Sequence, residues 1–313
     1  MTKDDLMVVI GPTASGKTSL AIEMAKKYDG EIVSCDSMQI YKGLPISTAQ
    51  PTEEEKEGVV HHLIGFVDVR DNFSVGEYQR LAREKIADIQ SRGKLPILCG
   101  GTGLYIDSVI YHMDFAKVSE DKSIRKKYTK YYDENGAEAL YSLLNEKAPD
   151  LAKRIHQNNV NRVIRALEVF DLTGEAKKEY YNETMKQLFY KNTIIVGTMW
   201  DRKELYERIN KRVDIMLQNG LIDEIKAILS YGIKPENTAY KAIGCKELSE
   251  YFNGKMALDE AIDKIKQYSR NYAKRQITWF KRLNDVFWLN YSNSEDINNK
   301  KAIVFSEIEN IYF

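Results

Sequence analysis

The stretch "LMVVIGPTASGKTSLAIEMAKKY" (Leu6–Tyr28) decides the fold, because it joins an apolar run, a glycine-rich turn and a helical pattern. Its first five residues are apolar and rich in β-branched side chains, which is typical of a strand buried on both faces. The turn, Gly11–Thr18, matches G-x-x-x-x-G-K-[ST] at every position, a sequence whose backbone N–H groups surround phosphates. The start of the chain therefore predicts a phosphate-binding loop between a strand and a helix.

The loop predicts phosphate binding but leaves the identity of the ligand open. The following helix adds the positive end of its dipole to the inward-pointing amides. Lys17 is placed to pair with phosphate oxygens, and the hydroxyl of Thr18 is placed to hold Mg²⁺. A chance glycine turn is the alternative, and the flanking strand and helix argue against it. The predicted ligand contacts are Gly11, Pro12, Thr13, Ala14, Ser15, Gly16, Lys17 and Thr18.

Four further apolar runs predict strands, at 31–36, 95–101, 192–200 and 285–290. Helical patterns separate strands in the first part of the chain, and strands that alternate with helices need crossover connections. Such connections give a parallel sheet. We therefore expect an α/β fold of the P-loop NTPase-like kind, a parallel sheet flanked by helices.

Residues 116–190 interrupt this pattern with helical periods such as "NRVIRALEVFDL". A strand pattern that resumes after a helical excursion indicates an insertion into the α/β core. We expect a catalytic core from 1–115 and 191–313 and an all-helical insertion domain at 116–190. The part after residue 201 is predicted to be mostly helical, and to hold the RNA-binding helices.

Composition and cysteine spacing indicate which kinds of site and which cellular location to expect. The 313 residues carry 46 basic and 46 acidic side chains, so net charge does not indicate a partner. Cys35, Cys99 and Cys245 form no CxxC pair, which argues against a zinc site or a disulfide framework and for a reducing compartment. The first apolar run is too short and too acidic for a signal peptide, and no run approaches 18 apolar residues. We expect a cytoplasmic monomer.

Asp36 is the acid at the end of a predicted core strand. A nucleotide hydrolase places a metal-holding aspartate at the end of another strand, but the run that ends in Cys99 and Gly100 carries no carboxylate there. Asp36 would face the crevice at the carboxyl ends of the strands, where ligands of open α/β sheets bind. It is predicted to be a metal ligand or a general base, and a helix cap or turn aspartate is the alternative.

Polar residues follow both strand ends. Ser37 and Gln39 extend the cluster at Asp36, and an amide such as that of Gln39 suits hydrogen bonds to a base edge, with plain solvent exposure as the alternative. The cluster Gly100–Gly103 follows the strand at 95–101, and its Thr102 can cap a helix or contact a ligand. The pair His61–His62 lacks partners at ligand spacing, so a structural role is favoured.

The segment Lys264–Arg282 carries seven Lys or Arg and no acid, with four aromatic residues between them. Lys266, Arg270 and Lys274 fall on one stripe of a helix. A cationic stripe beside aromatic rings suits an RNA backbone and unstacked bases, whereas a solvated charged face is the alternative. The predicted RNA contacts are Lys266, Arg270, Lys274 and Arg275, with further basic patches at Arg125–Lys127, Arg162 and Arg165.

Seven motifs occur in a familiar order: "GPTASGKT", "CDSMQIYKGLPISTAQP", "HHL", "GGTGLY", "NRVIRALEV", "DRKELYERINKRVD" and "YAKRQITWF". In these motifs the chain resembles bacterial tRNA dimethylallyltransferases (tRNA isopentenyltransferases) from Val8 to about Phe280. Met38, Lys42 and Cys245 are small departures from the pattern of that family. The departures do not touch the residues of the predicted chemistry.

The resemblance implies a reaction, in which the dimethylallyl group of dimethylallyl diphosphate moves to the exocyclic amine of the adenosine 3′ of the anticodon. The implied targets are tRNAs that read codons beginning with U. The resemblance also implies that the phosphate loop binds the isoprenoid diphosphate, that Asp36 is the base, and that Arg202 lies near the leaving diphosphate. Lys17 and Thr18 complete the implied catalytic set. The implied tRNA contacts are Asp36, Ser37, Met38, Gln39, Thr102, Asn161, Arg162, Val163, Ile164 and Arg165.

Two other functions are compatible with parts of the sequence. A P-loop kinase of a nucleoside or small metabolite would share the loop and use Asp36 as a base, but it does not explain the acid-free basic segment. An ATP-gated RNA-binding module leaves the aspartate at the strand end unexplained. Labelled ATP with small acceptors tests the first, and RNA binding without a covalent product would favour the second.

Overall fold

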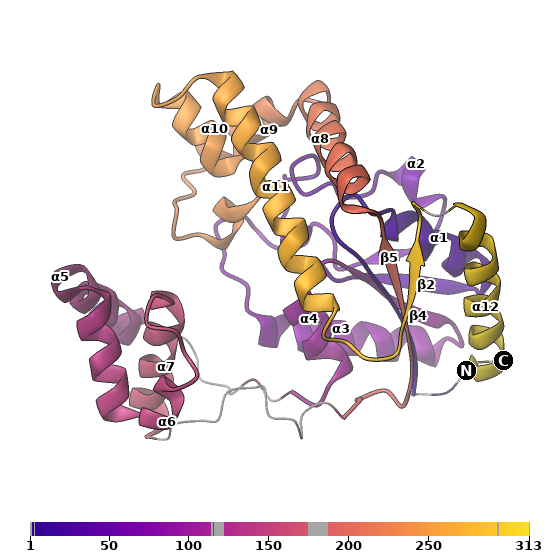
Figure 1. Cartoon of the computed structure of the whole chain (residues 1–313), viewed down its shortest axis with the longest axis horizontal. Coiled ribbons are helices and arrows are strands. Elements are labelled where there is room, and N and C mark those ends of the chain that lie inside the picture. Colours follow the sequence, from indigo (N-terminus) through magenta and orange to yellow (C-terminus); the bar gives the residue numbers. More distant parts are fainter. Residues whose placement is uncertain are drawn as a thin grey trace. The chain divides into compact units, whose positions relative to one another are not determined.

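The computed structural model describes residues 2, 4–113, 115, 122–174, 187–292 and 294–312. Within them one parallel sheet has the strand order β3-β2-β4-β1-β5-β6 (Figure 1). The predicted α/β fold with a parallel sheet is therefore confirmed. The strands are β1 (Asp5–Ile10), β2 (Gly30–Ser34), β3 (His61–His62), β4 (Leu95–Gly100), β5 (Asn192–Met199) and β6 (Val286–Asn290).

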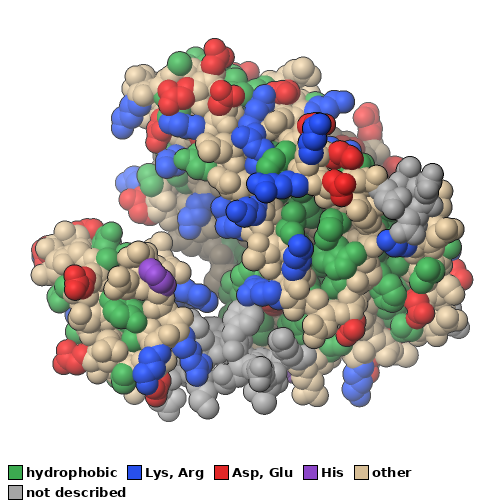
Figure 2. All heavy atoms as spheres, viewed as in Figure 1, with side chains coloured by type: hydrophobic (Ala, Val, Ile, Leu, Met, Phe, Trp, Pro, Cys, Tyr) green, Lys and Arg blue, Asp and Glu red, His purple; other side chains and the backbone are tan. Residues whose placement is uncertain are grey.

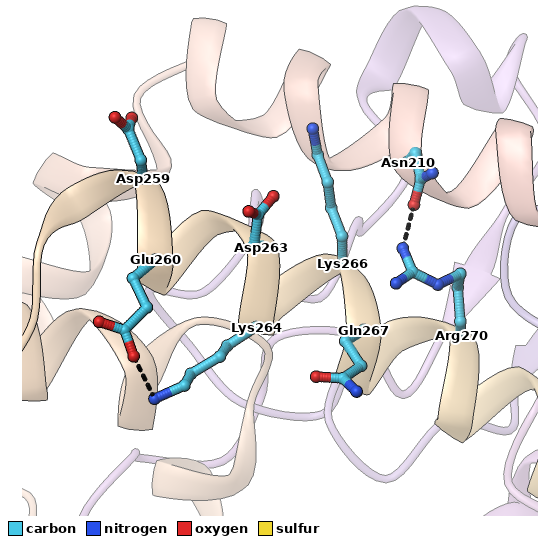
Figure 3. A pocket seen from close by; sticks show the side chains of 8 residues that line it. All are labelled: Asn210, Asp259, Glu260, Asp263, Lys264, Lys266, Gln267 and Arg270. Atoms are coloured by element: carbon cyan, nitrogen blue, oxygen red, sulfur yellow. Dashed lines mark hydrogen bonds and ion pairs between the residues drawn. The ribbon is translucent and has the colours of Figure 1, made fainter.

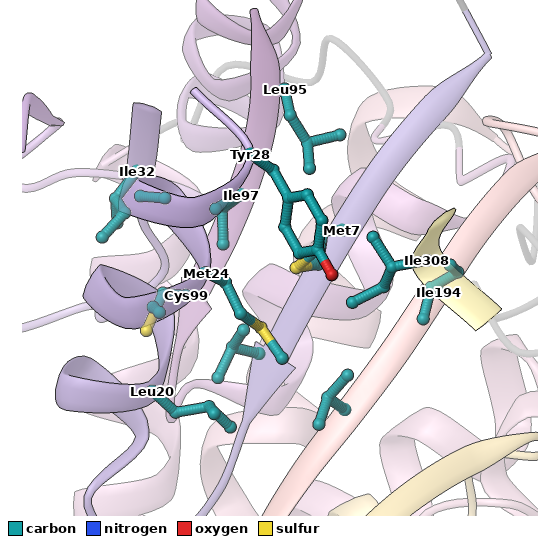
Figure 4. Close-up of a cluster of buried hydrophobic side chains, with 14 of the residues drawn as sticks. Met7, Leu20, Met24, Tyr28, Ile32, Leu95, Ile97, Cys99, Ile194 and Ile308 are labelled. Carbon is teal, nitrogen blue, oxygen red and sulfur yellow. The ribbon is translucent and has the colours of Figure 1, made fainter. Parts of the chain in front are cut away.

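Helices cover both faces of the sheet, and the alternation along β1 shows how. Met7 and Val9 pack with α1 and α12 (Figure 4), whereas Leu6, Val8 and Ile10 pack with α3 and α4. Because successive strand residues point to opposite faces, an apolar run fills both layers of the core. The helices of these layers are α1 (Lys17–Lys27), α3 (Val75–Ser91), α4 (Gly103–Ile110) and α12 (Ser294–Tyr312).

A third apolar cluster lies among the helices that follow β5. Ile225, Leu248 and Ile265 pack there against Ile40 and Leu44, which belong to the loop after β2. The long helix α11 (Leu258–Phe280) belongs to this group and also packs on α4 and α8, so it connects the helical part to the layers around the sheet (Figure 1). These helices are α8 (Arg202–Gln218), α9 (Leu221–Ser230), η2 (Thr238–Lys241), α10 (Cys245–Phe252) and α11. The short helix α2 (Glu53–Lys56) lies between β2 and β3 and contributes no buried residue.

The chain divides into two compact units, residues 1–111 with 188–313 and residues 112–187. The second unit has its own core, in which Tyr128 and Leu140 pack with Leu167. It contains α5 (Lys122–Lys147), which is broken at Gly136, α6 (Pro149–Ala152) and α7 (Val160–Thr173). In the part of the chain that the structure describes, no helix is long and apolar enough to cross a membrane.

A buried ionic cluster fixes the edge strand β3, which the sequence did not predict because two residues are too short for a pattern. Glu31 of β2 is 3 % exposed and accepts hydrogen bonds from both terminal nitrogens of Arg92. His62 of β3 lies 2.8 Å from the same carboxylate. The Arg92 hydrogen bonds are the largest cause that lowers the pKa of Glu31, to about 2. The structural role favoured for the histidine pair agrees with this contact.

Glu31→Gln should lower the free energy of unfolding at pH 7 by about 1–3 kcal/mol, because the bonds to Arg92 lose their charge. A carboxylate with a lowered folded-state pKa stabilises the fold above its unfolded pKa of about 4.3. That stability is lost as the pH falls towards 2. Urea unfolding at pH 7 and pH 3 should therefore show a smaller difference between wild type and variant at pH 3. Glu84→Gln, at an exposed pair with Arg80, should change stability by under about 1 kcal/mol.

Candidate active site

The phosphate loop follows β1 and leads into α1 at Lys17. Ala14 and Gly16 have positive φ angles of 62° and 86°, which turn the backbone sharply before the helix. A Cβ on Gly11 would overlap the hydroxyls of Ser15 and Thr198, so only glycine fits there. Those two hydroxyls lie 2.6 Å apart, which fastens the loop to the end of β5. A neighbouring strand therefore supports the loop through this contact.

Two arginines of α8 contact the loop directly. Arg212 donates to the hydroxyl of Thr13 (2.9 Å), and Arg208 donates to the carbonyl of Ala14 (2.9 Å). The guanidinium of Arg208 also lies over the Trp200 ring, at 4.2 Å from its centroid. The sequence analysis missed both arginines. A signal existed, because they lie four residues apart on a helix that begins directly after β5, whose end lies beside the loop.

Arg202, which was predicted near the leaving diphosphate, lies about two turns before Arg208 and about three turns before Arg212. Its Nε donates to the Tyr206 hydroxyl (3.3 Å), and its guanidinium lies 5.3 Å from the Tyr206 ring centroid. Its side chain is exposed. Of these three arginines, Arg208 and Arg212 contact the phosphate loop, so the geometry favours these two for binding a phosphate.

The charges around the loop are arranged for an anion. Burial is the largest cause that lowers the pKa of Lys17, and the nearby Arg212 lowers it further. Burial also lowers the pKa of Arg212, whereas the carboxylate of Asp36 acts in the opposite direction on both groups. Two cations that are partly removed from water and lie near each other are stabilised when an anion binds between them. Phosphate is such an anion.

Asp36 lies just beyond β2, within electrostatic reach of Lys17 and Arg212. Its Oδ1 accepts hydrogen bonds from the backbone N–H of Met38 (2.9 Å) and of Gln39 (3.4 Å). Asp36 therefore does stabilise a turn, which the sequence analysis gave as its alternative role. Within the described residues no hydrogen bond to Oδ2 is found, so one carboxylate oxygen is fixed by the turn and the other is available for chemistry.

The other polar residues after β2 have distinct roles. The Ser37 N–H donates to the hydroxyl of Thr102 (3.0 Å), so the two predicted polar clusters do meet. Gln39 uses both ends of its amide within the protein, since it accepts from Ser34 (3.0 Å) and donates to the carbonyl of Ala49 (2.9 Å). These contacts favour a structural role for Gln39 over the predicted contact with a base. Met38 is half-buried and packs against the third cluster.

In the second glycine cluster, Gly100–Gly103, the missing side chains leave room for neighbouring backbone and side chains. A Cβ on Gly100 would overlap the Cys35 backbone, and a Cβ on Gly103 would overlap the indole ring of Trp279. Trp279 belongs to α11 and donates from Nε1 to the Asp107 carboxylate of α4 (3.0 Å). Gly103 therefore allows α11 to pack against α4, and Gly100 allows the backbone after β2 to approach the end of β4. The sequence analysis did not separate these roles from close approach of a ligand.

The predicted cationic stripe of α11 consists of two different halves. In the first half Lys264 pairs with Glu260 (2.9 Å) and Arg270 donates to Asn210 (2.6 Å), as Figure 3 shows. Lys266 pairs with Asp214 of α8 (2.6 Å). The segment itself contains no acid, as the sequence shows, but acids that lie outside it pair with these two lysines and neutralise them. These residues line an open groove with Asp259, Asp263 and Gln267.

The second half of α11 lines a groove of about 560 Å³ that contains cations and an aromatic ring. Lys274 is exposed there, Arg275 lies 5.6 Å from the Tyr272 ring centroid, and Arg282 lies 4.1 Å from the Trp279 ring centroid. Figure 2 shows Lys and Arg side chains gathered along α8 and α11 on this face. The groove is lined by Asn271, Lys274, Arg275, Thr278, Trp279 and Arg282.

The predicted RNA-binding stretch of the second unit lies on α7. Val163 and Ile164 are 0 % and 5 % exposed and belong to the core of that unit. The prediction that these two side chains contact RNA therefore needs correction. They lie on the face of the helix that packs into the core, whereas other residues of the stretch lie on its exposed face. Arg165 and Arg125 lie 3.1 and 3.4 Å from the buried carboxylate of Glu168. Asn161 and Arg162 are exposed.

The residues present fit a metal ion that is held largely by its substrate. Among the described residues no group of three or more His, Cys, Asp or Glu side chains could hold a metal. The loop motif contains the Thr18 hydroxyl, and the carboxylate of Asp36 lies within electrostatic reach of Lys17 in the same motif. Mg²⁺ usually keeps several waters and binds through one or two protein oxygens together with substrate phosphates. This donor set is compatible with that mode of binding.

Comparison with known proteins places the chain in a family. The family model described as IPP transferase matches residues 39–283. A tRNA dimethylallyltransferase of Bacillus velezensis is 46 % identical over 303 residues, 97 % of this chain and 96 % of that protein. One of Bacillus subtilis is 44 % identical over 307 residues, 98 % of this chain and 97 % of that protein.

Solved structures agree. The tRNA isopentenylpyrophosphate transferase of Bacillus halodurans has a TM-score of 0.71 and 40 % identity, over 98 % of this chain and 97 % of that chain. A eukaryotic dimethylallyltransferase acting on tRNA has a TM-score of 0.83 and 32 % identity, over 97 % of this chain and 79 % of that chain. A family model that covers most of the chain and relatives of nearly equal length lead to one conclusion: the chain belongs to the IPP transferase family of prenyl-transferring enzymes.

Proposed function

We propose that this enzyme transfers the dimethylallyl group of dimethylallyl diphosphate to the exocyclic amine of the adenosine 3′ of the anticodon, in tRNAs reading codons that begin with U. One observation carries the proposal. Asp36 lies within electrostatic reach of two cations at the phosphate loop, Lys17 of the loop and Arg212 of α8. A site with this arrangement can hold a leaving diphosphate and receive a proton at the same edge of the sheet. The names of the relatives support this substrate pair.

In the proposed reaction the amine nitrogen forms a bond to the allylic carbon while the bond from that carbon to the diphosphate oxygen breaks. The electron pair of the broken bond leaves with the diphosphate. Lys17, Arg212 and the N-terminus of α1 stabilise this charge as it develops. The carboxylate of Asp36 accepts the proton that the amine loses. Arg202 was predicted beside the leaving group, and the contacts described above support Arg208 and Arg212 for that position.

Thr18 would hold Mg²⁺ together with the diphosphate oxygens, as its position in the loop motif predicts. The ion would supply further positive charge to the leaving group. The chain's own part is to present the hydroxyl of Thr18 at the first turn of α1, next to Lys17. The loop amides and the two cations orient the diphosphate independently of the ion.

RNA would bind along the second half of α11, where Lys274 and Arg275 can contact phosphates and the Trp279 ring can contact a base. Removing the adenosine from its stack costs a few kcal/mol, which backbone contacts elsewhere would offset. The helical insertion predicted at 116–190 would bind the anticodon stem-loop through Asn161, Arg162 and other exposed cations. Cytoplasmic location and a monomeric state stay predictions.

The direct test is the mass of the RNA product. An anticodon stem-loop RNA incubated with the enzyme, Mg²⁺ and dimethylallyl diphosphate should gain the mass of one dimethylallyl group, on the adenosine 3′ of the anticodon. Labelled ATP offered with nucleosides and small metabolites should give no labelled product. Phosphate transfer from ATP without any gain of mass on the RNA would favour the kinase.

RNA binding should depend on salt through the second half of α11. Lys274→Gln should lower the slope of log affinity against log salt by about 0.7–0.9, the value expected for one lost phosphate contact. Lys266→Gln should change the slope less, because Asp214 already neutralises that lysine. Filter binding from low to high salt measures both slopes. If Lys266→Gln has the larger effect, the first half of the helix is the RNA-binding half.

A further inference from the structure

Gln276 lies on the buried face of α11 and joins this helix to the phosphate loop. Its Oε1 accepts a hydrogen bond from the Thr13 N–H, and its Nε2 donates to the carbonyl of Gly101, both at 2.9 Å. The side chain is 5 % exposed, so water does not compete for these bonds. One amide thereby connects both glycine-rich loops of the site, although Thr13 is 263 positions away in the chain.

The second loop is shaped to receive this side chain. A Cβ on Gly101 would overlap Nε2 of Gln276. Gly101 has no positive φ angle, so the missing Cβ, and not the backbone conformation, explains the glycine. The loop therefore carries a glycine where the amide of Gln276 approaches its backbone.

Thr13 is held from two helices at once. Gln276 of α11 binds its N–H, and Arg212 of α8 binds its hydroxyl (2.9 Å). In the same turn of α11, Lys274 and Arg275 are exposed and line the groove. The helix that carries the proposed RNA contacts among its exposed residues thus holds a phosphate-loop amide through a buried one.

We propose that Gln276 is a positioning residue for the group transfer: from α11 it keeps the phosphate loop in the shape that binds the diphosphate. The inference rests on the proposed function. Without the amide, the Thr13 N–H and the Gly101 carbonyl are buried and unpaired, which favours other loop shapes. When only a fraction of molecules holds the competent shape, the apparent affinity for the ligand falls by that fraction.

The test is a double-mutant cycle that is read by diphosphate binding. Gln276→Ala removes the amide, and Gly101→Ala displaces it while leaving it in the chain. Each should raise the Kd of inorganic diphosphate, measured by calorimetry with Mg²⁺, by about tenfold. The double variant should be no weaker than the weaker single variant, because both changes break one contact. Gln267→Ala, the same change at an exposed position of α11, should leave the Kd unchanged.

RNA affinity and thermal stability separate positioning from a merely structural role. Positioning raises the Kd of diphosphate and the KM of dimethylallyl diphosphate, while the Kd of the stem-loop RNA and kcat at saturation stay within about twofold. A variant that loses RNA and diphosphate affinity in parallel with its Tm would overturn the inference. So would an unchanged diphosphate Kd in Gln276→Ala, or single effects that multiply in the double variant.

Two provisions keep the test decisive. If Gln276→Ala does not fold, Gln276→Met replaces it, since methionine fills the volume and lacks both hydrogen bonds. Wild-type transfer to RNA is measured in the same series. Its absence would contradict the proposed function, whereas normal transfer with an unaltered diphosphate Kd in the variants contradicts only the role of Gln276.

Discussion

Asp36→Asn should slow dimethylallyl transfer by about 10²–10⁴-fold, the usual contribution of a general base. The substitution is well matched to the structure, because the Asn side-chain oxygen can still accept the bonds from Met38 and Gln39 that Oδ1 accepts now. The turn is therefore kept, and only the charge and the proton acceptor are lost. Single-turnover transfer at saturating diphosphate and RNA measures the loss of the chemical step.

A magnesium titration distinguishes the two functions that the sequence left open for Asp36. If Asp36 is the base, raising Mg²⁺ leaves the rate of the variant low and both substrates still bind. If it holds the metal, the variant loses diphosphate affinity and extra Mg²⁺ restores part of the rate. Recovery to near the wild-type rate would contradict the assignment as base. Asp71→Asn, at an exposed loop position, serves as the control.

Lys17→Ala should abolish measurable transfer, with a loss of at least about 10²–10³-fold, the cost of removing one preorganised group that stabilises developing charge. Lys17 is the first residue of α1, and its Nζ donates a hydrogen bond to the carbonyl oxygen of Pro12 in the loop (3.5 Å). In the variant, this cation is missing when negative charge develops on the diphosphate during breakage of the bond to carbon. Arg212 alone cannot replace it. Quench-flow or long-time product assays measure the rate.

The affinity for RNA should survive in Lys17→Ala, because the proposed RNA contacts lie on α11 and α7. Filter binding of the stem-loop RNA tests this separation. Lys26→Ala removes a lysine from the same helix, one that pairs with Glu57 at the surface, and should leave the rate unchanged. A fall of RNA affinity in step with activity would mean that Lys17 serves more than the diphosphate.

The sequence by itself determined the parallel sheet and the phosphate loop, because both depend on short-range patterns. Among the described residues, five of the six strands were predicted from apolar runs, and the loop was predicted from eight consecutive residues. The position of Asp36 beside the loop also followed from the sequence, since the carboxyl ends of parallel strands meet at one edge. The strand β3 was missed, as two residues carry no period.

Only the tertiary structure decided which distant side chains complete the site. Arg212 and Gln276 reach Thr13 from 199 and 263 positions away. The place of a helix after a strand indicates that its first turns lie near the loop, but it does not specify which side chains contact Thr13. The same reason explains why a segment without acids is half neutralised, since Asp214 of another helix pairs with Lys266. Periodicity specifies which face of a helix is buried, but packing between helices specifies which charges and amides meet there.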